Sequence, residues 1–289
     1  MAPPAGIGCA AFELRGEMGA DGKIAGEDVL IADGELGLFA GAASDAIVHG
    51  TYRRTGKWAP ELLELLTKRL LCGGGTLLDI GANIGLVAVP TTERTQCRTL
   101  AFEPDPCNAA LLRRNIALHG LDQSIEVHEL ALFSSSGAMS LGRDASNHGD
   151  QRLLTNDVAE SPSVRVRTAC LDTLVEPATL ARPVVAKIDT QGAEVDVLAG
   201  AQRTLAQIEH AIVEVWPAGL ARVGRTLEEL IEALAAHFSH ARLLLAGEPI
   251  WPLAGLRTEF ARLDAVATLH DEDTFFDILV GHAADPPQP

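Results

Sequence analysis

Short apolar runs and helical stripes alternate along most of the chain. Pro60 suits the first turn of a helix, and the leucines that follow it form a broad apolar face that ends at Gly73-Gly74-Gly75. Short apolar runs come next, each typical of a strand that is buried on both faces. These runs cover residues 76–80, 99–102, 125–132, 184–188 and 210–216.

Helical segments are expected between these strands. One covers residues 105–120, and another covers residues 194–206. A third begins at Thr226, because Thr226 and Glu229 have the spacing of a capping box and apolar residues follow at helical spacing. Alternating strands and helices predict an α/β fold, a doubly wound, mostly parallel Rossmann-like sheet with helices on both faces.

The alternation does not extend to either end of the chain. Residues 1–58 are rich in turns and are expected to form an N-terminal appendage of strands and a short helix, which could serve as a lid. The core domain is expected over residues 59–284. The proline-rich residues 285–289 are expected to be a disordered tail.

Within the core, residues 134–165 are too long and polar for a simple connection and are interpreted as an inserted functional loop. Its flanks, residues 139–141 and 164–167, could be extra strands. Apolar runs at residues 242–245 and 274–280 are expected to close the sheet as an antiparallel pair.

Composition says more about the class of partner than about the fold. The chain of 289 residues is 47% hydrophobic and 21% charged, so it can bury a sizeable core, and its formal net charge of −16 argues against a nucleic-acid partner. The 5 cysteines include no CxxC pair, which is typical of reduced thiols in a cytoplasmic protein. No apolar run approaches the ~20 residues that span a bilayer, so no membrane partner is expected.

A glycine-bearing turn follows the first buried strand, in the run Asp79-Ile-Gly-Ala-Asn-Ile-Gly85. Gly81 and Gly85 would let the chain turn tightly and let a ligand approach the backbone. A dinucleotide site usually has G-x-G-x-x-G, whereas Asn83 replaces the middle glycine and the third is absent. Asn83 would crowd a pyrophosphate but could hydrogen-bond an amino-acid-like ligand tail, whose ammonium group Asp79 would suit. A tight turn without a ligand is the alternative.

Acidic residues end two of the later strands. Glu103, before Pro104, lies about twenty residues beyond the glycines, where an acid accepts hydrogen bonds from the ribose hydroxyls of an adenosine. Asp189 ends the strand at 184–188 and is followed by a glycine turn, so it should lie at the ligand-binding edge of the sheet. The alternatives are a solvated carboxylate for Glu103 and a turn or helix-cap aspartate for Asp189, while Glu194 suits the first turn of a helix.

Together these stretches resemble the FkbM-type family of S-adenosylmethionine-dependent methyltransferases. The likeness covers roughly residues 60–216, and one departure is Thr190-Gln191, where the family usually has Val-Glu. The matching segments are Asp79-Ile-Gly-Ala-Asn-Ile-Gly85, Phe102-Glu103-Pro104, Leu171-Asp172-Thr173-Leu174, Lys187-Ile-Asp-Thr-Gln-Gly-Ala-Glu194 and Val197-Leu198-Ala-Gly-Ala201.

The resemblance implies a class I methyltransferase domain that uses S-adenosylmethionine as its cofactor. It implies in-line transfer of a methyl group to a hydroxyl of a small-molecule acceptor, commonly a sugar or a polyketide-like secondary metabolite. It leaves a homodimer open. The cofactor-binding residues that it implies are Asp79, Gly81, Asn83, Ile84, Gly85, Glu103, Pro104, Ala131 and Leu132.

Three residues are candidates for a general base, because an aliphatic hydroxyl is a poor nucleophile. Asp189 ends a core strand, His148 lies in the polar insertion, and Glu214 interrupts the apolar run at 210–216. A solvated loop histidine and a paired buried glutamate are the alternatives for His148 and Glu214. The remaining histidines show no metal-ligand spacing, so no metal site is expected.

Two other readings of the core remain open. A nicotinamide-dependent oxidoreductase would show a third glycine after Gly85 and a catalytic Tyr-Lys set, yet Tyr52, the 1 tyrosine, lies upstream of the core. A non-catalytic module that binds an adenosine cofactor would keep Asp79, Asn83 and Glu103, as this chain does. Binding of S-adenosylhomocysteine, together with methyl transfer, separates these readings from a methyltransferase.

Overall fold

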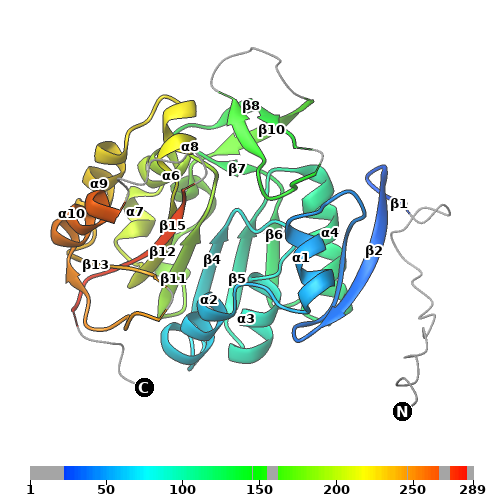
Figure 1. Ribbon diagram of the computed structural model, residues 1–289, viewed down its shortest axis with the longest axis horizontal. Helices are drawn as coiled ribbons and strands as arrows, with labels where there is room; N and C mark the ends of the chain where they lie inside the picture. Colours follow the sequence, from blue (N-terminus) through cyan, green and yellow to red (C-terminus); the bar gives the residue numbers. More distant parts are fainter. Residues whose placement is uncertain (1–22, 145, 155–161, 246, 267–273, 285–289) are drawn as a thin grey trace.

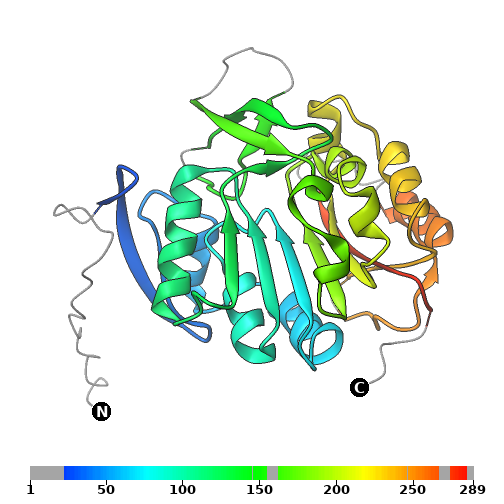
Figure 2. The ribbon, with the colours of Figure 1, turned by 180° about the vertical axis from the view of Figure 1, so that it is seen from behind.

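The computed structural model describes residues 23–144, 146–154, 162–245, 247–266 and 274–284 (Figure 1). The expected tail at 285–289 lies outside the described residues. None of the described helices is long and apolar enough to cross a membrane. A twisted eight-stranded sheet occupies the centre, a smaller sheet lies across one end of it, and a ribbon of N-terminal strands flanks it (Figures 1 and 2).

The central sheet has the strand order β14-β13-β15-β12-β11-β4-β5-β6. Neighbouring strands from β12 to β6 are parallel, whereas β15 runs antiparallel to both β12 and β13. The chain leaves β4 first toward β5 and later returns to β11, so the topological switch point lies between β4 and β11. The strands are β4 (Thr76–Ile80), β5 (Arg98–Phe102), β6 (Ile125–His128), β11 (Val184–Ile188), β12 (His210–Val215), β13 (His240–Leu243), β14 (Ala254–Gly255) and β15 (Phe276–Gly281).

Successive side chains of the buried strands point to opposite faces of the sheet, so both faces are apolar. Helices cover each of them. Leu77 packs against one group of helices and Leu78 against the other. The first group is α2 (Pro60–Leu65) with the π-helical turn at Leu66–Leu70, α3 (Ala88–Thr95) and α4 (Pro106–Leu118). The second is α5 (Leu171–Leu174), α6 (Glu194–Ala199), α7 (Gln202–Leu205), α8 (Pro217–Arg222), α9 (Leu227–Ala235) and α10 (Leu256–Val266), with a 3-10 turn at Pro177–Thr179.

This architecture confirms the doubly wound α/β fold, and the antiparallel closing strands are present as β13 and β15. The capping box of Thr226 and Glu229 begins α9. Two expectations were wrong in detail. The run at 125–132 is not one strand, because the chain leaves the central sheet after His128, and the segment at 194–206 breaks at Gly200, where a Cβ atom would lie 2.1 Å from the carbonyl oxygen of Phe133.

The smaller sheet has the order β7-β10-β8-β9 and is built by the insertion together with the chain that leaves β6. β7 pairs in parallel with β10, and the other pairs are antiparallel. β8 and β10 contain the flanks that were expected to be extra strands, and the sheet lies across the carboxyl ends of the central parallel strands (Figures 1 and 2). Its strands are β7 (Ala131–Leu132), β8 (Gly137–Gly142), β9 (Arg152–Leu154) and β10 (Ser163–Ala169).

The N-terminal strands pack on the first group of helices. β1 (Lys23–Ile24), β2 (Glu27–Gly34) and β3 (Gly37–Ala42) form an antiparallel ribbon, which α1 (Val48–Thr55) follows. The amide of Asn115 on α4 accepts a hydrogen bond from the backbone N–H of Ala40 at 2.7 Å and donates to its carbonyl at 3.0 Å and to that of Ile84 at 2.8 Å. Phe39 and Tyr52 are fully buried in the same apolar cluster as α4. The ribbon therefore shares its core with the central sheet.

Candidate functional site

A cavity of about 550 Å³ opens at the carboxyl ends of β4, β5, β11 and β12. Its volume lies within the range of roughly 300–1,000 Å³ that is usual for small-molecule sites. The N-terminal elements contribute Val48 and Trp58 to its wall, and the smaller sheet contributes Leu141 and Leu153. The cavity lies at the switch point of the central sheet, where open α/β sheets bind ligands.

The glycine turn after β4 forms part of the wall and is closely packed beneath it. Gly81 has a φ of +83°, and a Cβ atom there would lie 1.8 Å from the carbonyl oxygen of Asp189, so only glycine fits. The N–H groups of Gly81 and Ala82 both donate to the carbonyl of Phe102 at 3.0 Å. Asn83 adopts a left-handed conformation with a φ of +50° and faces the cavity. The turn is thereby locked against the ends of two neighbouring strands.

Glu103, at the end of β5, joins this turn to the start of α4. One carboxylate oxygen accepts the backbone N–H of Asn83, and the other accepts that of Asp105, both at 2.8 Å. Burial raises the pKa of Glu103 to about 8, although both N–H bonds act in the opposite direction. Glu103 and Pro104 line the cavity, where the sequence predicted a ribose contact, and that role stays a prediction.

Asp79 lies behind the turn and not on the cavity wall. Its carboxylate is fully buried, and burial raises its pKa to about 6 even though Lys187 acts to lower it. The Lys187 ammonium donates to the carbonyl of Gly81 at 2.9 Å and lies 3.0 Å from Asp189 and 3.8 Å from Asp79. The structure thus differs from the expectation that Asp79 meets a ligand ammonium directly. Lys187, which the sequence analysis did not single out, stands between Asp79 and the cavity.

Asp189 and Glu214 lie together on the cavity wall at the ends of β11 and β12. The side-chain amide of Gln191 donates to Asp189 at 2.8 Å and to Glu214 at 2.7 Å. Burial alone would raise the pKa of Asp189, but the charge and hydrogen bond of Lys187 outweigh it and lower that pKa. Burial, and then the Asp189 charge, raise the pKa of Glu214 well above its usual range. Gln191, one of the two residues at which the chain departs from the resemblance, provides an amide that bridges two carboxyl groups.

Asp277 and Trp216 also line this end of the cavity, and neither was selected from the sequence. Asp277 opposes Glu214 in the register of β15 with β12. Burial, with the neighbouring Asp189 charge, raises the pKa of Asp277 to about 6. The guanidinium groups of Arg152 and Arg222 lie over the Trp216 ring, 5.7 Å and 4.8 Å from its centroid.

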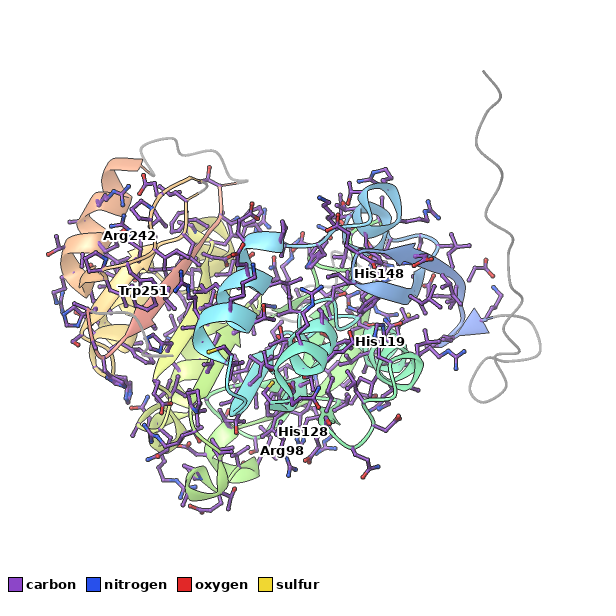
Figure 3. All side chains as sticks on the ribbon, turned by 90° about the horizontal axis from the view of Figure 1, so that it is seen from below. Arg98, His119, His128, His148, Arg242 and Trp251 are labelled. Atoms are coloured by element: carbon purple, nitrogen blue, oxygen red, sulfur yellow. The ribbon has the colours of Figure 1, made fainter. Side chains whose placement is uncertain are left out.

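His148 comes from the insertion and lies beside the N-terminal elements, as Figure 3 shows. Its carbonyl oxygen accepts the side-chain amides of Asn83 at 2.8 Å and of Asn108 at 3.0 Å. Its imidazole Nε2 lies 3.2 Å from the hydroxyl of Ser44, and the residue is 6% exposed. The predicted loop histidine is therefore buried on the cavity wall, and its backbone ties the insertion to the glycine turn.

The cavity brings together most, not all, of the residues that the sequence analysis selected. Ile84 and Gly85 support the turn from inside the core and do not line the cavity; a Cβ atom on Gly85 would lie 2.6 Å from Leu112. No group of three or more His, Cys, Asp or Glu side chains within the described residues is arranged to hold a metal ion. The selected residues on the wall are Gly81, Asn83, Glu103, Pro104, Ala131, Leu132, His148, Asp189 and Glu214.

Comparison with known proteins gives a family match over the central part of the chain. The profile described as "Methyltransferase FkbM domain" matches residues 79–243. The chain is similar to the hexuronic acid methyltransferase AglP of Haloferax volcanii, with 31% identity over 141 residues, which cover 48% of this chain and 55% of that protein. It is also similar to methyltransferase 1 of Beauveria bassiana, with 28% identity over 143 residues, 43% of this chain and 57% of that protein.

The aligned segments span little more than half the length of these two relatives. A longer match is methyltransferase sdnD of Sordaria araneosa, 26% identical over 175 residues, which cover 50% of this chain and 68% of that protein. Among solved structures, a methyltransferase FkbM from Methylobacillus flagellatus is 15% identical, with a TM-score of 0.45 and coverage of 73% of this chain and 44% of that chain.

Proposed function

The chain belongs to the methyltransferase FkbM domain family, and from that premise we propose that it transfers a methyl group from S-adenosylmethionine to a hydroxyl of a small-molecule acceptor. One observation carries the proposal. One cavity is lined both by the glycine turn with Glu103 and by Asp189 and Glu214. A nucleoside donor and an acceptor would therefore meet in one cavity.

The residues at the turn fit the donor by their chemistry. Glu103 presents a carboxylate on the cavity wall that suits the two hydroxyls of a ribose, and Asn83 presents an amide beside it. Buried Ala131 and Leu132 give an apolar surface that suits an adenine ring. When bound, S-adenosylmethionine supplies a methyl group on a positively charged sulfur. The carboxylate of Asp189, held by Lys187 at 3.0 Å, lies on the same wall and would favour that charge.

We further propose that the acceptor is a sugar or a secondary metabolite that is methylated on oxygen. One relative is named a hexuronic acid methyltransferase, which supports a carbohydrate acceptor. The acceptor end of the cavity combines the flat ring of Trp216 with carboxyl groups, a combination that can bind an apolar face and hydroxyl groups of one ligand. A formal net charge of −16 makes nucleic acid an unsuitable acceptor.

Binding of the donor product is the first test. Isothermal titration calorimetry with S-adenosylhomocysteine should show one site per chain, and NAD should not compete. Glu103→Ala should weaken this binding at least ten-fold. Glu126→Ala removes a carboxylate from the neighbouring strand β6 that pairs with Arg98 and does not line the cavity, so its binding should match the wild type. Equal binding of all three proteins would contradict the proposed donor site.

Transfer is the second test, with labelled S-adenosylmethionine and a panel of sugar and polyketide hydroxyls. Asp189→Asn should lower turnover while donor binding is largely kept, because the group acts on the reacting end of the cavity. An unchanged rate would remove Asp189 from the chemistry. Donor binding without transfer to any member of the panel would favour a non-catalytic binding module, and a melt that shifts with NAD alone would favour an oxidoreductase.

A further inference from the structure

The carboxylates on the cavity wall differ in how they are already engaged. Glu103 accepts two backbone N–H groups, and Asp150 pairs with Arg152 at 2.9 Å. Asp189 pairs with Lys187, and the Gln191 amide donates to both Asp189 and Glu214. Among the described residues on this wall, Asp277 is the carboxylate whose side chain makes no hydrogen bond or ion pair. Its oxygens are thus free to accept a proton or a hydrogen bond from a ligand.

The position of Asp277 follows from the antiparallel strand in the sheet. β15 enters the sheet at the end where β11 and β12 finish, so the second residue of β15 reaches the ligand edge. Directly opposed residues of an antiparallel pair share one face, which places Asp277 beside Glu214. Its own backbone carbonyl accepts the N–H of Leu244 at 2.9 Å, which fixes the start of the strand. Asp277 therefore stands on a rigid element at the acceptor end.

The charged groups around Asp277 come from its two neighbouring strands β12 and β13, from the end of β11 and from the insertion. Lys187 on β11, Asp189 just after β11 and Glu214 on β12 interact electrostatically with Asp277 and line the same cavity. On its other neighbour, β13, Arg242 opposes Leu279 and lies 3.7 Å from Glu248. From the insertion, Asp150 lines the same cavity and is paired with Arg152. Lys187, Arg242 and Arg152 thus each have another carboxylate as an ion-pair partner.

We propose that Asp277 is the general base that takes the proton from the acceptor hydroxyl. The inference rests on the proposed methyl transfer and deepens it. In this step the hydroxyl oxygen forms a bond to the methyl carbon while the carbon–sulfur bond breaks and its electron pair stays on sulfur. The hydroxyl proton moves to the carboxylate of Asp277, which later releases it to solvent. The products are a methyl ether and S-adenosylhomocysteine, and no other reactant is needed.

The other two carboxyl groups at this end are less suited to the role. The pKa of Asp189 is lowered by Lys187 against the effect of burial, so Asp189 is a weak base. The pKa of Glu214 is raised well above its usual range by burial and by Asp189, and its carboxyl group already accepts a hydrogen bond from the Gln191 amide at 2.7 Å. Burial raises the pKa of Asp277 to about 6, which leaves it ionised at neutral pH and more basic than an ordinary aspartate.

The test compares Asp277→Asn with the wild type in the rate of transfer to an acceptor that the wild type methylates. General-base catalysis contributes typically 10²–10⁴-fold, so kcat should fall at least about 100-fold. The wild-type kcat should rise as the pH increases through about 6 and then level off, because the base must be ionised. That acid limb should be absent in Asp277→Asn and should return, with part of the rate, in Asp277→Glu. A purely structural role would not remove the limb selectively.

Two controls make the result decisive. The Kd for S-adenosylhomocysteine should change less than two-fold in Asp277→Asn, which would show that the variant is folded. The second control, Glu126→Gln on β6, makes the same change from carboxylate to amide away from the cavity. If the wild type transfers methyl groups and Asp277→Asn retains both the rate and the acid limb, the role of Asp277 is overturned and the proposed function still stands. A wild type that neither binds S-adenosylhomocysteine nor transfers would overturn the proposed function, and the inference with it.

Discussion

The buried carboxylate of Asp105 ties the insertion to the core, and its removal should destabilise the protein strongly. Asp105 is fully buried, and one of its oxygens caps α4 by accepting the N–H groups of Cys107 at 2.9 Å and Asn108 at 3.0 Å. The same carboxylate accepts two hydrogen bonds from the Arg143 guanidinium, at 2.6 Å and 2.9 Å. Arg143 follows β8, whereas Asp105 follows β5, so this pair joins the two sheets.

The expected cost depends on which partner is removed. Arg143→Ala leaves a carboxylate buried without its cation, which should cost about 3–5 kcal/mol in the free energy of unfolding. Asp105→Asn keeps a good N-cap and leaves Arg143, which is 33% exposed and can be hydrated, so the cost should be lower, about 2–3 kcal/mol. Asp105→Ala also removes the cap and should cost about 1 kcal/mol more than Asp105→Asn.

Urea unfolding measures these differences through the fluorescence of the 3 tryptophans, with circular dichroism as a second probe. At roughly 2–4 °C per kcal/mol, Arg143→Ala should also lower the Tm by about 10 °C. The double variant Asp105→Asn with Arg143→Ala should be less destabilised than the sum of the two single variants. An Arg143→Ala protein within about 0.5 kcal/mol of the wild type, as for an ordinary surface change, would refute this reasoning.

Three further predictions follow from the turn, its neighbour and a helix cap. The pKa of Glu103 in the folded protein is about 8 against an ordinary value of 4.5, so its stabilising contribution is full below pH 4.5 and is lost as the pH rises toward 8. Between these values the free energy of unfolding should fall as the pH rises, and Glu103→Gln should make that slope shallower by up to about 1.4 kcal/mol per pH unit. An unchanged slope would contradict the raised pKa. Gly81→Ala should abolish S-adenosylhomocysteine binding and lower the Tm sharply, whereas Gly120→Ala, with a φ of +65° and open space around the new Cβ atom, should lower the Tm by only a few degrees; similar melts would refute the packing argument. Thr226→Ala should cost about 1 kcal/mol in urea unfolding and Thr226→Ser much less, and equal losses would show that the capping box contributes little.

Much of the central fold could be predicted because its strands are buried on both faces. β4 and β11 consist of side chains that are all buried, and such runs stand out in the sequence against the polar connections. The ends of strands and the breaks within helices were harder to predict. Ala131 and Leu132 continue an apolar run, yet they pair with β10, a strand that lies far along the chain, and no local pattern contains that partner. Close approach of Gly200 to the carbonyl of Phe133 is equally non-local.

The site could be predicted only where a motif places it. Glu103 and Asp189 end strands beside glycine turns, and the resemblance gave them roles to test. Lys187 belongs to the same matching segment but was treated as part of a buried strand, since nothing local shows that its ammonium reaches the carbonyl of Gly81. Asp277 is the second residue of an antiparallel strand, and its neighbourhood is set by register with Glu214, so spacing along the chain carries no signal for it. Gln191 looked like a loss of charge, and its bridging role appears only once two strand ends meet.

The hydrogen bonds between Asn115 and β3 have a practical consequence for the design of shortened versions of this chain. The family match begins at residue 79, but a fragment cloned from there would lack Ala40, and the Asn115 amide would lose two of its three hydrogen bonds inside the core. It would also lay bare the apolar surface that Phe39 covers. The stretch that is recognisable across relatives is thus shorter than the stretch that can fold, so expression should start ahead of β1.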